Sequence, residues 1–155
     1  MDPSDAVDHV AIGALQAAYG DAVTRRAWSE VVALFEPDAT VTLDLGRGEP
    51  RVLGPVELVA FVEEAISRFD LFLFTVLNRV VLDLDGDDAT GRVWLAEIRQ
   101  DHDGAASTAY GRYDDRYRRT GLTWRIAERR YRSVARTAPP GSGAAFEVVA
   151  RDEAG

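Results

Sequence analysis

Asp115 is the acidic residue whose surroundings most favour acid–base chemistry. It lies two positions after Tyr113 in a strand-like segment, 107–119, so both side chains share one face of that strand. If Tyr113 points into the protein, so does Asp115, and burial would raise the pKa of its carboxyl group towards neutrality. The alternative is that Asp115 lies on the surface and pairs with Arg116 or Arg130.

Two further polar residues interrupt apolar alternation. Glu97 shares a face with Val93 and Leu95, which makes it either an interior carboxylate or the partner of an arginine on the next strand. Asn78 alternates with apolar residues that include Val80, which indicates the buried face. A buried amide needs hydrogen-bond partners, so Asn78 either bridges backbone groups or orients a ligand.

Besides Tyr113, three aromatic residues are candidates for a binding site. Tyr19 falls in the apolar stripe of the first expected helix, where its hydroxyl would bond either across the core or to a ligand. Trp28 begins the second helix and either packs at the helix junction or contacts ligand. Phe74 is a core or pocket-wall residue. The two histidines, His9 and His102, fall near the start of the chain and in an expected hairpin turn, outside any expected pocket.

The elements that must position these residues are helices first and long strands afterwards. Helical spacing of apolar residues and β-branched or alternating runs separate the two kinds of segment. We expect helices up to Val23, over 28–35 and over 56–67, with strands over 39–45, 69–84, 89–100, 107–119 and 123–134. This order predicts an α+β fold in which three N-terminal helices pack on a curved, cone-shaped antiparallel sheet. Residues 1–136 would form the domain, and 137–155 a flexible tail that adds an edge strand or contacts a subunit.

Composition narrows the function further. The chain has 155 residues, 46% of them hydrophobic, which suits one globular domain with a real core. Its net charge of −8 disfavours nucleic acid as a partner. No cysteine is present, so disulfides, thiolate catalysis and most zinc sites are excluded. The chain shows no secretory signal and no membrane-spanning run, and we expect a cytoplasmic location without membrane association.

The sequence resembles the SnoaL-like branch of the nuclear transport factor 2-like superfamily, over about residues 9 to 134. The resemblance rests on Tyr19, Trp28, the run from Leu34 to Val41, Gly54, Asn78, Asp85 to Ala89, Gly111 to Asp115, and Trp124 to Ile126. It implies a cystatin-like α+β barrel around one pocket, a small apolar ligand and homodimers. The family chemistry that it implies is proton abstraction beside a carbonyl without a metal or organic cofactor.

The resemblance also suggests catalytic residues. Similarity to ketosteroid isomerase implies Tyr19 as an oxyanion donor and Asp115 as a second donor, while similarity to SnoaL-type cyclases implies Asp115 as the base. The isomerase base position falls on Leu43, and Asp44 fits it only after a one-residue shift, which on a strand changes the face. The resemblance to scytalone dehydratase places Thr24 where that family has an aspartate. It places Phe74 where that family has a histidine.

Two functions follow from these observations. One is an isomerase, cyclase or lyase acting on a hydrophobic cyclic or polyketide-like compound; the other is a ligand-binding or dimeric scaffold protein without turnover. For the first, the catalytic residues would be Asp115, Tyr19 and Asp44. In either case the ligand contacts would come from Asn78, Tyr113, Trp28, Phe74 and Glu97.

Overall fold

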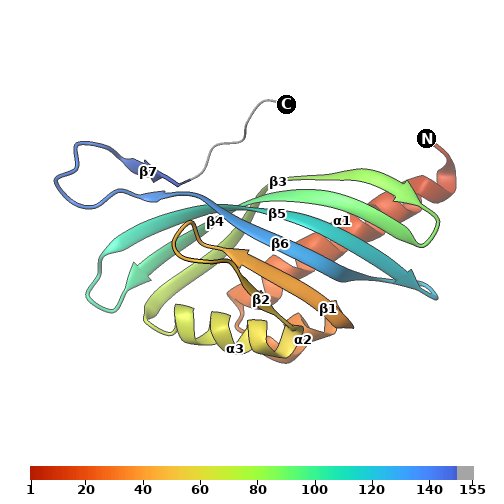
Figure 1. Ribbon diagram of the computed structural model, residues 1–155, viewed down its shortest axis with the longest axis horizontal. Helices are drawn as coiled ribbons and strands as arrows, with labels where there is room; N and C mark the ends of the chain where they lie inside the picture. Colours follow the sequence, from red (N-terminus) through yellow and green to blue (C-terminus); the bar gives the residue numbers. More distant parts are fainter. Residues whose placement is uncertain (150–155) are drawn as a thin grey trace.

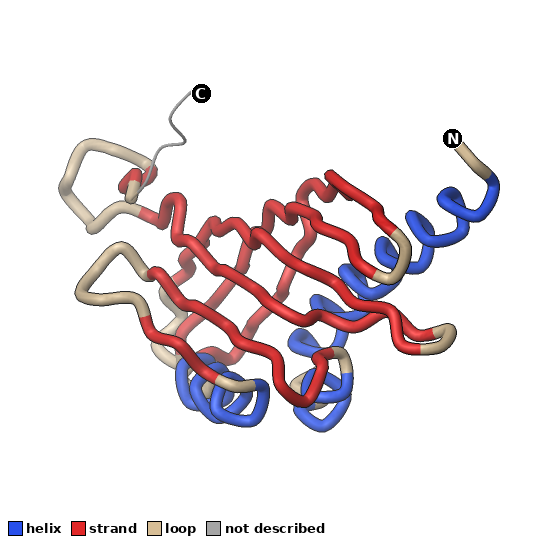
Figure 2. Tube along the Cα trace, turned by 45° about the vertical axis from the view of Figure 1, so that its right-hand side comes forward, coloured by secondary structure: helices blue, strands red, loops and turns tan. Residues whose placement is uncertain are grey.

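The computed structural model describes residues 1–149 and contains three helices and a seven-stranded sheet. The helices are α1 (Pro3–Thr24), α2 (Trp28–Ala33) and α3 (Pro55–Ile66). The Asp2 side chain caps α1 by accepting the Ser4 N–H at 2.8 Å, and a proline occupies the first turn of both α1 and α3. Figure 2 shows the sheet curving over the helices, so that its concave face and the helices enclose the core.

The sheet is mixed and open. Its strands are β1 (Phe35–Asp44), β2 (Arg51–Leu53), β3 (Phe69–Asp85), β4 (Asp88–Asp101), β5 (Ala106–Thr120), β6 (Thr123–Thr137) and β7 (Phe146–Val148). They are arranged in the order β2-β1-β6-β5-β4-β3, with β7 added to β6 (Figure 1). The four long strands from β3 to β6 form the antiparallel meander that the sequence predicts, with hairpins at Gly86, Gly104 and Gly121 in the left-handed conformation.

The α+β prediction is confirmed, and the structure adds three details to it. β1 pairs with β6 in parallel, so the sheet is not wholly antiparallel and does not close into a barrel. β1 also begins at Phe35, before Pro37, because Phe35 pairs with Ile126 and the ladder tolerates an irregularity between Phe35 and Thr40. A short β2 lies within the segment expected to be a loop.

The end of the chain joins the sheet in part. β6 continues to Thr137, and Phe146–Val148 form β7, which runs antiparallel to β6 through the pairs that Ala135, Arg136 and Thr137 make. Residues 150–155 of the expected tail lie outside the described part of the chain. None of the helices within residues 1–149 has the length and apolar character needed to cross a membrane.

Candidate functional site

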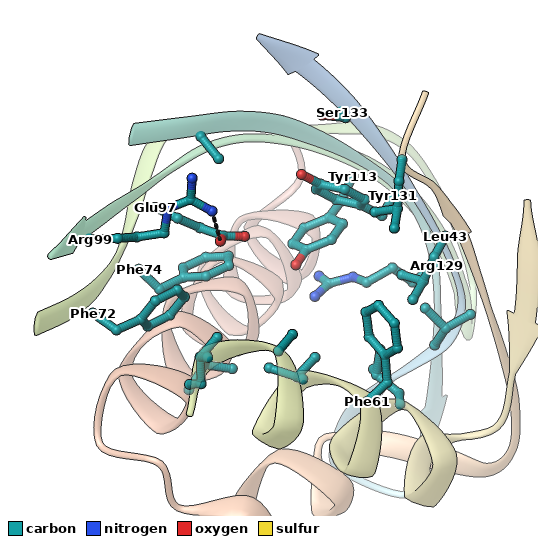
Figure 3. Close-up of a pocket in the computed structure, with 18 of the residues that line it drawn as sticks. Leu43, Phe61, Phe72, Phe74, Glu97, Arg99, Tyr113, Arg129, Tyr131 and Ser133 are labelled. Atoms are coloured by element: carbon teal, nitrogen blue, oxygen red, sulfur yellow. Dashed lines mark ion pairs between the residues drawn. The ribbon is translucent and has the colours of Figure 1, made fainter. Parts of the chain in front are cut away.

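A cavity of about 410 Å³ lies between the concave face of the sheet and helices α1 and α3 (Figure 3). Its wall is mainly aromatic and aliphatic, with a few charged groups, which is the usual composition of a small-molecule site. The lining residues are Tyr19, Val23, Val41, Leu43, Leu45, Arg47, Leu58, Phe61, Val62, Ala65, Ile66, Arg68, Phe72, Phe74, Glu97, Arg99, Ala109, Tyr113, Arg129, Tyr131, Ser133 and Arg136.

The sheet part of the wall is built from rows of directly paired residues on neighbouring strands. In one row, Phe74 of β3 pairs with Glu97 of β4, Glu97 with Ala109 of β5, and Ala109 with Arg136 of β6. Because paired residues point to the same face of a sheet, these four side chains all reach the cavity. A β-bulge at β6 places one extra residue between Ser133 and Arg136, which keeps both on the concave face despite their odd spacing.

Gly111 makes room for the aromatic wall. A Cβ atom at this position would stand 2.3 Å from the Cε2 atom of Tyr131 and 2.8 Å from its hydroxyl. The missing side chain therefore lets the Tyr131 ring lie across β5 and face the cavity. Burial raises the pKa of Tyr131, so its hydroxyl stays protonated at neutral pH and can donate a hydrogen bond.

Arg129 is a cation buried beside the cavity. Its side chain is 1% exposed, and Nε and Nη2 donate to the two Asp115 oxygens at 2.8 and 2.7 Å. The guanidinium carbon lies 3.8 Å from the centre of the Tyr113 ring and 4.4 Å from that of Tyr19. Burial by itself would lower the pKa of Arg129, but the charge of Asp115 and the hydrogen bonds to it raise the pKa above its ordinary value. Arg129 is therefore charged.

One donor of Arg129 is unused. Its Nη1 atom is buried and has no hydrogen-bond partner within residues 1–149. A buried guanidinium N–H without a partner carries a substantial desolvation cost. Figure 3 shows the guanidinium group reaching into the space between Tyr113 and Phe61.

Within residues 1–149, Glu97 is the only carboxylate that lines the cavity. Burial raises the pKa of Glu97, and the charge of Arg99 opposes this shift only in part. The Glu97 Oε2 and Arg99 Nη1 atoms are 4.0 Å apart, which is too far for a hydrogen bond, while Arg99 Nε donates to Ser107 Oγ at 3.1 Å. The carboxylate therefore keeps lone pairs available to a bound molecule.

Tyr19 and Tyr113 are buried residues of the cavity wall. Their rings meet edge to face, with centroids 5.7 Å apart, and Phe74 contacts both. Burial raises the pKa of Tyr19, and it raises the pKa of Tyr113 well above the ordinary value. Both hydroxyls therefore remain protonated at neutral pH and can act as hydrogen-bond donors.

Four of the site residues predicted from the sequence line the cavity, namely Tyr19, Tyr113, Phe74 and Glu97. Asp115 faces inward, as its alternation with Tyr113 predicts, but it lies outside the cavity wall. Both of its oxygens are occupied by Arg129, and the hydroxyl of Tyr117 also donates to Oδ2 at 2.7 Å. Asp115 is thus the counter-ion of Arg129.

The other selected residues lie elsewhere. Leu43 lines the cavity, so its neighbour Asp44 faces away, and the Asp44 carboxylate accepts the Gly46 N–H at 3.0 Å. Asn78 is exposed, because a register irregularity in β3 between Val76 and Asn78 changes the alternation. Trp28 is half-buried against the core and lies outside the cavity wall.

Arg129 is not among the site residues predicted from the sequence. The signal that could have identified it is the cross-strand pair with Asp115, since a buried carboxylate needs a cation beside it. The two positions where scytalone dehydratase has its aspartate and histidine are also linked here, because the Phe74 N–H donates to Thr24 Oγ1 at 3.0 Å. Within residues 1–149, no three His, Asp or Glu side chains gather as metal ligands would.

Residues 4–130 match the family described as the SnoaL-like domain, and the chain belongs to this family. No match was found among curated proteins.

Several solved structures share the fold of this chain. A proposed aromatic ring hydroxylase from Novosphingobium aromaticivorans is 26% identical, with a TM-score of 0.70 over 86% of this chain and 92% of that one. A proposed scytalone dehydratase from the same organism is 18% identical, with a TM-score of 0.78 over 99% and 100%. A protein of unknown function from Mycobacterium tuberculosis is 26% identical, with a TM-score of 0.70 over 86% and 76%.

Proposed function

We propose that this protein is an enzyme that removes a proton from a small, largely apolar cyclic compound, in an isomerase, cyclase or lyase reaction. The observation that carries the proposal is that one cavity holds both a carboxylate of raised pKa, Glu97, and an unpartnered buried donor, Arg129 Nη1. A base and a donor for the developing negative charge are the two groups that such a reaction needs.

Glu97 is the proposed base. A carboxylate whose pKa is raised accepts a proton more readily than an ordinary one. Its neighbours in the wall include the apolar residues Phe72 and Phe74.

Arg129 is the proposed oxyanion donor. Because Asp115 balances its charge, Arg129 can stay in an apolar site before the reaction begins, with Nη1 already free. Such a preorganised donor favours the transition state, in which negative charge grows on an oxygen, over the neutral ground state. The protonated hydroxyl of Tyr19 is available as an additional donor.

The proposal is tested with a generic substrate for carboxylate bases, because the natural one is unidentified. In 5-nitrobenzisoxazole, a base takes the carbon-bound proton, the N–O bond breaks, and the oxygen leaves as a coloured phenolate. We expect turnover by the wild-type protein, and a loss of roughly 10²- to 10⁴-fold in Glu97→Gln. The matched control is Asp44→Asn, which removes a carboxylate outside the cavity.

The pH profile supplies a second criterion. The rate should follow ionisation of Glu97 and rise through an apparent pKa above the value of about 4.3 for a free glutamate side chain. If the wild-type protein does not accelerate the reaction, or if the Glu97 and Asp44 variants lose activity equally, catalysis by Glu97 is refuted. The cavity would then serve for ligand binding without turnover.

A further inference from the structure

The charge of the cavity wall is opposite to that of the whole protein. The chain carries a net charge of −8, yet the described residues of the wall include five arginines and one carboxylate. The arginines are Arg47, Arg68, Arg99, Arg129 and Arg136. Positive charge that is concentrated in one cavity of an acidic protein attracts anions selectively to that cavity.

Three of the five arginines have acidic partners. Arg129 pairs with Asp115 at 2.7 Å, while Arg99 and Arg68 lie 4.0 Å from Glu97 and Asp101, respectively. These contacts balance part of the charge within the protein itself.

The other two, Arg47 and Arg136, form no ion pair with any residue between 1 and 149. Both line the cavity where the loop after β1 is exposed to solvent. Arg47 is exposed in the loop after β1, and the half-buried Arg136 donates from Nη2 to the carbonyl of Leu45 at 3.3 Å. This part of the cavity therefore carries positive charge that is not balanced by the described residues.

The Arg136 side chain is oriented towards the cavity by its strand and by a hydrogen bond. The β-bulge before it turns the side chain to the concave face, and its contact with the Leu45 carbonyl fixes the guanidinium group. The Nε atom is buried and has no hydrogen-bond partner among the described residues. In the row of paired residues, Ala109 lies between Arg136 and Glu97, and its small side chain leaves space over the middle of the row.

We propose that the natural ligand is an aromatic or alicyclic carboxylic acid whose carboxylate is bound by Arg136 in this part of the cavity. This inference rests on the proposed function in so far as it names the substrate class of the same site. A carboxylate matches the planar guanidinium fork of Arg136, which lines the cavity. The ring system of the ligand would lie against Phe61, Phe74 and Tyr131.

The two unpartnered guanidinium atoms then have different roles. Arg129 is neutralised by Asp115, so its Nη1 atom suits a neutral carbonyl oxygen that becomes negative during the reaction. Arg136 has no acidic partner among residues 1–149, so it suits a group that is negative before the reaction begins. A ligand with both groups would be oriented along the cavity, with its reactive carbon between them and Glu97 on the same wall.

The test compares 2-naphthoate with its neutral analogue 2-naphthamide by isothermal titration calorimetry. We expect the wild-type protein to bind the carboxylate at least about tenfold more tightly than the amide. In Arg136→Gln, affinity for 2-naphthoate should fall roughly ten- to hundredfold, while affinity for the amide changes little. The matched control is Arg118→Gln, which removes a half-buried arginine paired with Asp38 at 3.9 Å outside the cavity.

Retained binding of the amide by Arg136→Gln shows that the variant is folded and that the cavity is intact. The inference is overturned if the wild-type protein binds the two compounds equally, or does not bind 2-naphthoate at millimolar concentration. It is also overturned if the Arg136 and Arg118 variants lose affinity to the same extent. Because 5-nitrobenzisoxazole is uncharged, its turnover tests Glu97 separately, and either proposal can fail while the other holds.

Discussion

Replacing Asp115 by Asn would leave the Arg129 guanidinium buried without its counter-ion. The two side chains are 0% and 1% exposed, and they are joined by two hydrogen bonds of 2.8 and 2.7 Å. Breaking a buried ion pair by removing one partner costs about 3–5 kcal/mol. Asn keeps the size of Asp and one acceptor oxygen, so the cost reflects charge more than packing.

This magnitude is large for a protein of this size. In a chain of 155 residues, each kcal/mol lowers the melting temperature by about 2–4 °C, so Asp115→Asn should melt roughly 6–20 °C lower than the wild type. The control is Asp44→Asn, in which the amide oxygen can still accept the Gly46 N–H; we expect a change within about 0.5 kcal/mol.

Urea denaturation, followed by circular dichroism, measures the free energy of unfolding of each variant. The double variant Asp115→Leu with Arg129→Met removes both charges and should recover much of the lost stability, since an apolar pair can replace a buried ion pair. A loss below about 1 kcal/mol in Asp115→Asn, with turnover abolished, would refute the reasoning. Asp115 would then be a proton-transfer group and not a counter-ion.

Three further predictions follow from the structure. Because burial raises the pKa of Glu97 in the folded state, ionised Glu97 costs stability at higher pH. Glu97→Gln should therefore melt above the wild type at pH 8, and the difference should disappear below about pH 4; a difference that grows at low pH would contradict this. Gly111→Ala would force the Tyr131 ring away from a Cβ atom at 2.3 Å and should destabilise the protein by about 1–3 kcal/mol in urea, whereas unchanged stability would show that the ring moves freely. Leu73 and Ile98 pair on the outer face of the sheet and are each 40% exposed; we expect a homodimer through this face, which Leu73→Glu should convert to a monomer in light scattering, and a monomeric wild type would exclude it.

Alternation along the chain predicts the fold well because its long strands keep one face apolar over many residues. The same rule fails where a strand gains or loses a residue. The irregularity after Val76 turns Asn78 to solvent, and the bulge before Arg136 turns that arginine into the cavity. Neither irregularity can be recognised in the sequence, since a bulge depends on how two strands pair. Arg129 was missed for a related reason, because its burial depends on the cross-strand contact with Asp115.

The choice of Glu97 over Asp115 as the base depends on their partners and not on their burial. Both carboxylates lie on the concave face of the sheet, and the sequence favours Asp115 because of its alternation with Tyr113. In the structure three donors occupy Asp115, namely Nε and Nη2 of Arg129 and the hydroxyl of Tyr117. To accept a proton, Asp115 would have to give up contacts that keep a cation in the interior. Glu97 has only a cation 4.0 Å away, so its lone pairs remain available and burial raises its pKa. The same fold thus assigns one carboxylate to hold Arg129 in place and leaves the other free to react.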